Sequence, residues 1–465
     1  MASTNCWRCL ARPSQRLLLA PVSVSVAASG PTSAAFSTSA QQLAKVASES
    51  TKHIRTGKRL TLGRKKRTPD KTKPPLSGER KAFRKRIQLS NDNALEVPGL
   101  DVLTSESTVN PESVGKIFGL PVEVVDQLRA CEAFKSSQNW SLFRSPHTLV
   151  RKETVDLAKQ MVDAIEKKET LRLVVAGNRG SGKSILGLQA LTTGFLNKWV
   201  VINIPEGQEL TKASTEYATI PNSDMFSQPV YTVKLMQAIH QTNQQVLSQH
   251  KVQLDHMQLP ISVTRNMTLA ALLSATKEPD FAWPVFQAFW KELLLPGRPP
   301  ILFSLDGLAH IMRISEYRSP AFELIHSHDL SLLRMFTDAL GGKTTFPNGA
   351  AILGVTAKGN APTIPSMEKA IAQATAAQKG EEPPSRDPFF RKYDERVFDA
   401  LRGVRVLDVQ GVSKTEARAL MEYWAASGIL RSRIDERSVS EKWTMSGNGV
   451  VAEMERVVLD DLRNN

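Results

Sequence analysis

One short stretch, residues 171–184, limits what this chain can fold into more than any other part of it. An apolar, β-branched run, Leu-Arg-Leu-Val-Val-Ala at residues 171–176, predicts a buried strand, and Gly-Asn-Arg-Gly-Ser-Gly-Lys-Ser follows it directly. Apolar residues then recur at helical spacing and predict an amphipathic helix, at Ile185, Leu188, Leu191 and Phe195. Strand, loop and helix stand in the order of a P-loop; an incidental glycine-rich turn with a lysine is the alternative.

The residue types in this loop suit a bound chain of phosphates. Glycines let backbone N–H groups turn inward and approach a phosphate closely, where a Cβ would obstruct them. Lys183 is predicted to bridge the β- and γ-phosphates and Ser184 to offer its hydroxyl to Mg²⁺, while the helix N-terminus adds partial positive charge. The predicted phosphate-binding residues are Gly177, Asn178, Arg179, Gly180, Ser181, Gly182, Lys183 and Ser184.

Five short apolar segments predict the strands of a parallel α/β sheet, because helical or long connecting segments separate them. They are residues 171–176, 199–204, 301–305, 351–356 and 404–409. A helix is expected at about residues 152–168, before the first strand. A helical insertion is expected at residues 207–298, with helices near 233–248, 269–276 and 284–295, and with Pro284 in the first turn of the last.

Composition divides the rest of the chain. Residues 91–150 are predicted to form an N-terminal pre-domain without catalytic chemistry, and residues 151–365 the P-loop nucleotide-binding domain. Residues 366–395 become Ala/Gln-rich and then Glu/Pro-rich, which favours an exposed connection. Residues 396–465 would supply the last strand and a C-terminal helical lid, where Ser413 and Glu416 predict a capping box and Gly428 a helix stop.

The positive charge of the chain is concentrated near its N-terminus. The net charge is +14, and residues 1–86 hold 19 Lys/Arg against three acidic residues, so the remainder is nearly neutral. Residues 1–48 have no acidic residue, many Ser and Ala, and arginines at Arg8, Arg12 and Arg16. We therefore predict a mitochondrial presequence at residues 1–42, removed near Phe36 to Gln42, and a matrix location; a disordered serine-rich terminus is the alternative.

Residues 43–90 are predicted to form a basic, disordered arm. Residues 52–86 hold 15 Lys/Arg and two acidic residues, and like charges at this density prevent collapse. Counterion release from a phosphate backbone favours RNA as the partner, with a solvated linker or a nuclear-import-like cluster as alternatives. No apolar run reaches the length of a membrane span. Cys6 and Cys9 fall in the presequence, which leaves Cys131 without a disulfide partner.

Asp306, at the end of the third predicted strand, is the main site residue outside the loop. P-loop proteins hold Mg²⁺ through a carboxylate at this edge of the sheet, so Ser184 and Asp306 are the predicted metal residues; an Asp that starts a turn is the alternative. Gly307 stands where many ATPases of this class place the glutamate that activates water. Glu206 could substitute as a base, although a solvated loop acid is the more common role.

Further residues carry weaker expectations, and no catalytic residue is predicted. Thr356 could sense a terminal phosphate and Arg418 could reach one from the C-terminal helix, but an ordinary strand-end Thr and a surface Arg are the alternatives. Three histidines lack the spacing of a helical two-histidine metal site: His310, His326 and His328. No Asn-Lys-x-Asp guanine motif follows the loop, and Thr356-Ala-Lys358-Gly is at best a distant stand-in. The residues alone do not choose between ATP and GTP.

A combination of segments resembles the death-associated protein 3 family of mitochondrial small-subunit ribosomal proteins over about residues 94–465. The segments are Phe134…Trp140-Ser-Leu-Phe143-Arg-Ser-Pro146…Leu149-Val-Arg151, the loop from Gly177 to Ser184, Trp199-Val-Val-Ile-Asn-Ile-Pro205, Ile301-Leu-Phe-Ser-Leu-Asp306-Gly307 and Leu407-Asp-Val…Glu416…Tyr423-Trp424…Gly428. The combination is specific to the family, whereas the P-loop alone is not.

The resemblance implies an AAA+-like fold that holds GTP or GDP structurally with Mg²⁺, hydrolyses it slowly at most, and contacts small-subunit rRNA and neighbouring mitochondrial ribosomal proteins. It carries metal support to Asp306 and phosphate contacts to Gly180, Ser181, Gly182, Lys183 and Ser184. The choice of guanine rests on the resemblance, ATP is not excluded, and no homo-oligomer is expected. The alternatives are an active P-loop ATPase that remodels RNA or protein in the matrix and an apoptosis-linked signalling adaptor.

Overall fold

The computed structural model describes residues 87–464 apart from positions 265 and 360, and these residues belong to one unit, Ser77–Asn465. The predicted presequence and nearly all of the predicted basic arm lie outside the described residues. Within the described part, no helix is both long and apolar enough to cross a membrane. Cys131, the cysteine of this part, is buried with a free thiol, and burial raises its pKa to about 12.

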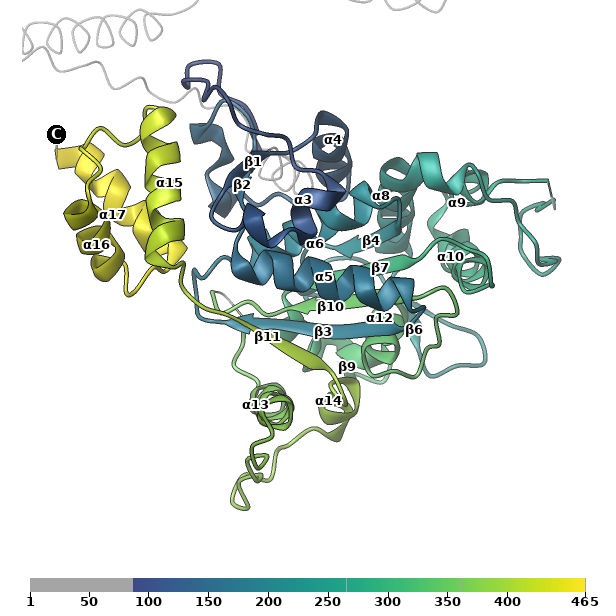
Figure 1. The fold of residues 1–465 in the computed structure, drawn as a ribbon. Helices are drawn as coiled ribbons and strands as arrows, with labels where there is room; N and C mark the ends of the chain where they lie inside the picture. Colours follow the sequence, from purple (N-terminus) through teal and green to yellow (C-terminus); the bar gives the residue numbers. More distant parts are fainter. Residues whose placement is uncertain (1–86, 265, 360, 465) are drawn as a thin grey trace, which may run out of the picture. The chain divides into compact units, whose positions relative to one another are not determined.

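A five-stranded parallel sheet forms the centre of the described chain (Figure 1). Its strands are β3 (Thr170–Gly177), β4 (Val200–Ile204), β7 (Ile301–Asp306), β10 (Ala350–Val355) and β11 (Arg405–Val409). The order across the sheet is β11-β3-β10-β7-β4, and every neighbouring pair is parallel. The predicted α/β class and five-stranded parallel sheet are therefore confirmed. The prediction succeeds because continuous apolar runs are typical of strands that are covered on both faces of a sheet.

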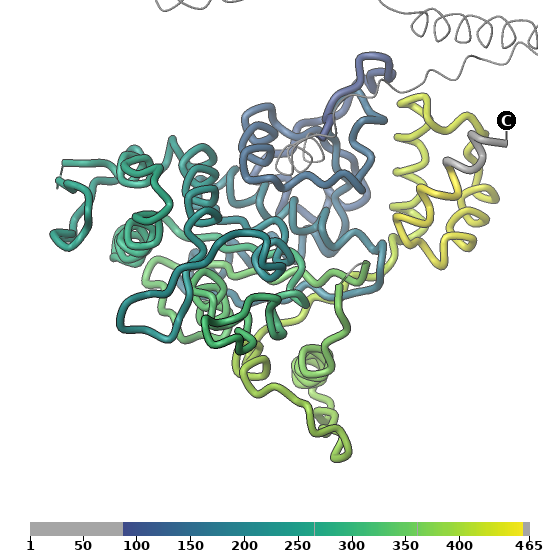
Figure 2. Tube along the Cα trace, turned by 180° about the vertical axis from the view of Figure 1, so that it is seen from behind, coloured from purple at the N-terminus to yellow at the C-terminus, as the bar shows by residue number. Residues whose placement is uncertain are grey.

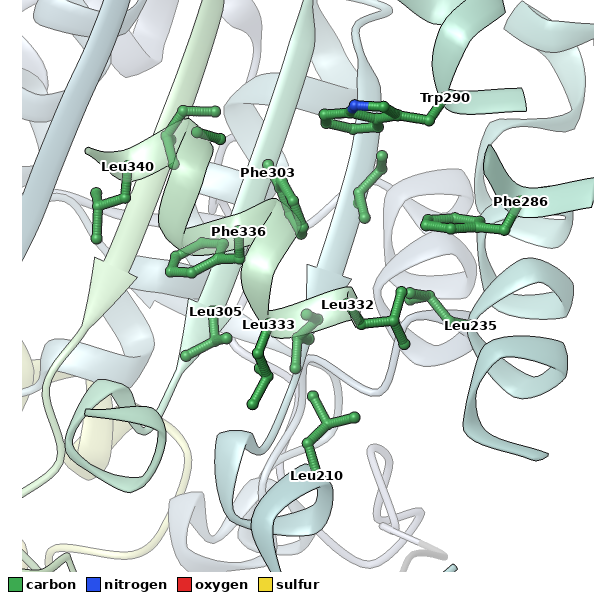
Figure 3. Packing of buried hydrophobic residues seen from close by; sticks show 14 of the residues in the cluster. Leu210, Leu235, Phe286, Trp290, Phe303, Leu305, Leu332, Leu333, Phe336 and Leu340 are labelled. Carbon is green, nitrogen blue, oxygen red and sulfur yellow. The ribbon is translucent and has the colours of Figure 1, made fainter. Parts of the chain in front are cut away.

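Two hydrophobic clusters cover the two faces of the sheet. On one face β3 and β10 pack against α5 (Lys152–Glu166), α6 (Lys183–Leu196) and α4 (Val122–Ala130) of the pre-domain. On the other face β7 packs against α10 (Pro279–Leu293) and α12 (Ser331–Leu340). Figure 3 shows Phe303 of β7 between Trp290 and Phe336, with ring centroids 5.7 and 5.1 Å away. This core fixes the sheet edge at which β3 and β7 end.

The helix that follows the P-loop sequence differs from the expectation of one apolar face. Every residue of α6 from Leu186 to Phe195 is buried. The pre-domain helix α4 and the next helix, α5, explain the difference, because both contact α6 and cover the side that the pattern assigned to solvent. The start of α6 is therefore held between the sheet and the pre-domain.

The insertion after β4 is helical, as expected. It holds α7 (Gly207–Thr211), α8 (Pro229–Leu247), α9 (Leu269–Ser274) and α10, together with the short strands β5 (Ala218–Thr219) and β6 (Phe226–Ser227). The predicted position of Pro284 is wrong, because α10 begins at Pro279 and Pro284 lies inside the helix. Burial of Trp283, Phe286 and Phe289 along α10 offsets the hydrogen bond that an internal proline removes.

The prediction of an exposed connection at residues 366–395 is wrong for the first half of that segment. Residues Pro365–Lys379 form α13, which buries Met367, Ala370 and Ala376 and contacts β11 and α14 (Glu395–Ala400). The alanines of this segment are small enough to pack closely. Between β7 and β10 lie α11 (Leu308–Ile311), β8 (Ile314–Arg318), β9 (Leu324–His326) and α12.

The C-terminal helices α15 (Lys414–Ala426), α16 (Glu436–Met445) and α17 (Val451–Asn464) pack beside the pre-domain, as Figures 1 and 2 show. The predicted capping box of Ser413 and Glu416 is confirmed, and Gly428 follows the helix end with a φ of +80°. Tyr423 of α15 stacks on Phe143 and hydrogen-bonds His147 at 3.0 Å. The remaining pre-domain elements are α3 (Ser105–Val109), β1 (Ile117–Gly119) and β2 (His147–Leu149).

Candidate nucleotide-binding site

The loop between β3 and α6 is shaped by glycines that no other residue could replace without strain. Gly177, Gly180 and Gly182 have φ values of +139°, +77° and +97°. A Cβ on Gly177 would stand 2.4 Å from the carbonyl oxygen of Val409, and one on Gly180 would stand 2.9 Å from the Cβ of Ala452. The backbone of the loop is therefore packed tightly between β11 and the start of α17.

Arg151 connects the loop to its surroundings. Its buried guanidinium donates to the carbonyl oxygens of Ser181 and Gln410, both at 2.8 Å, and to Glu153 at 3.1 Å. One side chain thus joins the loop, the start of α5 and the segment after β11. Arg151 belongs to the segments that carry the family resemblance, but its sequence context predicts no role for it. A cation just before a helix gives no sign of such contacts.

Lys183 lies against the loop, with Lys358, Asp306 and Asp408 as the charged groups that act on it. Its Nζ donates to the carbonyl oxygens of Gly177 at 3.1 Å and Asn178 at 2.5 Å. Burial lowers the pKa of Lys183, the nearby Lys358 ammonium lowers it further, and Asp306 and Asp408 partly oppose both effects. Because two neighbouring cations disfavour each other, an anion placed near both is favoured there. Lys358 is exposed after β10.

Asp306, the last residue of β7, pairs with a residue from the pre-domain. The Nζ of Lys135 contacts its Oδ2, and the side chains of Lys135 and Asp306 are 27% and 11% exposed. The other carboxylate oxygen, Oδ1, is buried and has no hydrogen-bond partner among the described residues. The pre-domain therefore supplies a cation to the predicted metal carboxylate, a contact that the sequence does not indicate.

The oxygen ligands at this edge of the sheet could bind Mg²⁺ only together with further oxygen atoms from outside the described residues. The hydroxyl of Ser184 and the carboxylate of Asp306 are the oxygen ligands that Mg²⁺ prefers, and Oδ1 of Asp306 is an orphaned acceptor. The described residues contain no group of three or more His, Cys, Asp or Glu that could hold a metal. A metal at this place would therefore take further oxygens from phosphate and water. It would supply positive charge beside the phosphates.

Other residues singled out from the sequence have ordinary structural contacts. The Thr356 hydroxyl donates to the Val175 carbonyl oxygen at 2.9 Å and so ties β10 to β3. Arg418 pairs on the surface with Glu422 at 2.9 Å. Glu206 is exposed at the start of α7.

Two of the three histidines, His326 and His328, lie together, and the described residues contain no group of three or more potential metal ligands around them. His326 pairs with Asp394 at 3.0 Å, and its ring meets that of His328 edge-on. Burial lowers the pKa of His328 to about 3, so its ring stays neutral.

A cavity of about 650 Å³ opens beside the loop. Gly177 and Asn178 line it together with the ends of β10 and β11 and with α13, and its charged residues include Lys358 and Asp408. Cavities of this size are typical of sites for small molecules. The cavity therefore adjoins the start of the loop and is large enough for a small molecule.

The fold and this loop define an α/β protein with a P-loop sequence at the turn from strand to helix of a parallel sheet. The family model described as mitochondrial ribosomal death-associated protein 3 matches residues 148–457. The chain therefore belongs to the mitochondrial ribosomal death-associated protein 3 family. The family and the location in the mitochondrion that the sequence predicted are both confirmed.

Two fungal relatives match along much of the chain. The small ribosomal subunit protein mS29 of Neurospora crassa is 52% identical over 464 residues, which cover 99% of each chain. The protein of the same name from Schizosaccharomyces pombe is 21% identical over 352 residues, covering 74% of this chain and 71% of that one.

Among solved structures, the Aeropyrum pernix Orc1 protein in complex with DNA matches 68% of this chain and 61% of its own, with 12% identity and a TM-score of 0.31. A likeness at that score supports no conclusion about fold or function.

Proposed function

We propose that this protein is a constituent of the small subunit of the mitochondrial ribosome, that it binds a guanine nucleotide with its P-loop, and that it contacts rRNA. Identity of 52% with the Neurospora crassa small-subunit protein over nearly the whole length carries the first part. Because the two chains match over nearly their whole length at this identity, we expect both to belong to the same assembly. The family resemblance supports the AAA+-like class of P-loop fold.

The nucleotide part rests on the geometry of the loop. Three glycines with positive φ, the ammonium of Lys183 and the start of α6 give the loop the backbone freedom and the charge that polyphosphates require. The phosphate contacts fall on Gly177 through Ser184, with Mg²⁺ support on Ser184 and Asp306. Guanine is favoured over adenine by the family resemblance alone.

The backbone at Gly307 supports a structural nucleotide over rapid hydrolysis. Gly307 has a φ of +86°, a backbone conformation that residues with a Cβ rarely adopt. A glutamate with that φ would be strained, so the water-activating residue of many related ATPases does not fit this turn. GTP or GDP would then act by stabilising the folded chain.

Co-sedimentation tests the assembly. In a sucrose gradient of mitochondrial lysate, the protein is expected to migrate with the small subunit, and the purified chain is expected to release little phosphate over many turnovers. Migration as free protein, together with rapid turnover of ATP, would instead support the matrix ATPase.

The RNA contact is tested on residues 52–86, which lie outside the described residues. Their deletion, with residues 1–51 retained, is expected to weaken binding to small-subunit rRNA and to flatten the salt dependence of log K. The slope should become shallower by about 0.7–0.9 for each phosphate that the arm neutralises in the wild type. An arm of the same length with serine at each Lys and Arg is the matched control for chain length. An unchanged slope in both variants would make the arm a linker.

A further inference from the structure

The ammonium of Lys135 lies where a cation beside Asp306 would otherwise be expected. It contacts Oδ2 of Asp306 from the pre-domain, 171 positions earlier in the chain, while Oδ1 stays buried without a partner among the described residues. The contact that the structure gives to this carboxylate is therefore the Lys135 ammonium at Oδ2.

The turn that carries Lys135 is braced. The Oε1 of Gln138 accepts from the Lys135 backbone N–H at 2.8 Å and from the Trp140 indole at 2.7 Å, and Trp140 packs edge-on against Phe134. The backbone of Lys135 is thus fixed, and only its four-carbon side chain is free to move. The lysine has an acidic alternative, because Glu206 lines the same cleft as Lys135.

The Asp306 carboxylate cannot bind a lysine ammonium and a divalent metal ion at full strength at the same time. An ammonium bound at Oδ2 neutralises Asp306 and blocks one of its two oxygens, which weakens its attraction for a divalent ion. With Lys135 turned toward Glu206, both oxygens of Asp306 become available. In either arrangement a positive charge lies beside the place of the phosphates.

We propose that Lys135 and Mg²⁺ are alternative partners of Asp306, so that the site retains a guanosine diphosphate at low Mg²⁺ with Lys135 as the resident cation. This inference rests on the nucleotide binding proposed above. It assigns to the pre-domain a direct part in the site. It also predicts that Lys135 determines how strongly the affinity of the site for GDP depends on Mg²⁺.

The test measures the Kd of fluorescent GDP for the full-length protein across a Mg²⁺ titration that starts in EDTA. Wild type is expected to lose less than about tenfold in affinity without Mg²⁺. Lys135→Gln is expected to lose a further tenfold or so in EDTA and to need about tenfold less Mg²⁺ for half of its gain in affinity. Lys135→Arg keeps the charge and should resemble wild type more than Lys135→Gln does.

Lys116→Gln is the matched control, because Lys116 is an exposed lysine of the same pre-domain. Asp306→Asn in the Lys135→Gln background should abolish the new Mg²⁺ response, since the lysine acts through that carboxylate. Melting curves confirm that each variant is folded. Equal Mg²⁺ half-points in wild type and Lys135→Gln would overturn the inference, as would a hundredfold loss of wild-type affinity in EDTA. Absence of GDP binding at every Mg²⁺ concentration would refute the proposed function itself.

Discussion

Replacing Lys183 by alanine is expected to weaken guanine nucleotide binding by roughly 100-fold. Truncating one member of a largely buried, charge-assisted contact costs about 2–5 kcal/mol, and about 2.8 kcal/mol corresponds to that factor. Lys183 is 6% exposed and lies on the loop itself, so its charge would act on the phosphates with little screening. Isothermal titration with GDP measures the loss directly.

The same variant should lose the stabilisation that the nucleotide gives. A ligand at about 100 times its Kd stabilises the folded state by about 2.7 kcal/mol through mass action, so the variant should melt earlier and incorporate poorly into the small subunit. Lys167→Ala is the matched control, since Lys167 is an exposed lysine that follows α5, just before β3 begins. A Lys183→Ala protein that keeps its nucleotide and melts like wild type would show that the Lys183 ammonium does not hold the phosphates.

Glu292→Gln is expected to produce the largest loss of stability, about 3–5 kcal/mol, because it leaves a buried cation without its counter-charge. Glu292 is 0% exposed and accepts from Arg298, which is 6% exposed, and from the backbone amides of Gln253 and Leu254 at 3.0 and 2.7 Å. His256 contacts the same carboxylate at 3.1 Å. These contacts fix the loop between α8 and α9 against α10. Urea unfolding of the purified chain measures the change.

Two further variants make this prediction specific. Glu422→Gln removes an exposed partner of Arg418 on α15 and should cost less than about 1 kcal/mol. Replacing Glu292 and Arg298 together by Met should recover part of the loss, because no unpaired charge then remains buried. If Glu292→Gln and Glu422→Gln cost the same, the buried pair does not hold this loop.

The sheet could be predicted because each of its strands has a recognisable apolar sequence pattern that does not depend on the rest of the chain. The strands β4, β7 and β10 are buried at every position, and continuous runs of Val, Ile and Leu indicate such strands whatever surrounds them. The capping box of α15 was equally local, since Ser413 and Glu416 satisfy each other within one turn. The family was predictable from several separated motifs.

Contacts between distant parts of the chain could not be predicted in the same way. The sequence places Lys135 in a segment that shows no pattern of a site, and its pairing with Asp306 exists only once the pre-domain packs on α6. The contacts of Arg151 and the burial of α6 from Leu186 to Phe195 have the same origin. The alanines of α13 resemble a polar connection until β11 covers them. Such features depend on which surfaces meet, and local composition does not determine that.

The most direct measurement is the identity and amount of nucleotide released from natively purified small subunits that carry this protein, determined by mass spectrometry after denaturation. Subunits with the wild-type chain are expected to release a guanine nucleotide in an amount close to that of the protein, and subunits or free chains with Lys183→Ala should release far less. An adenine nucleotide in its place would contradict the proposed base. Equal release from wild type and Lys183→Ala, or none from either, would contradict a nucleotide held at this P-loop.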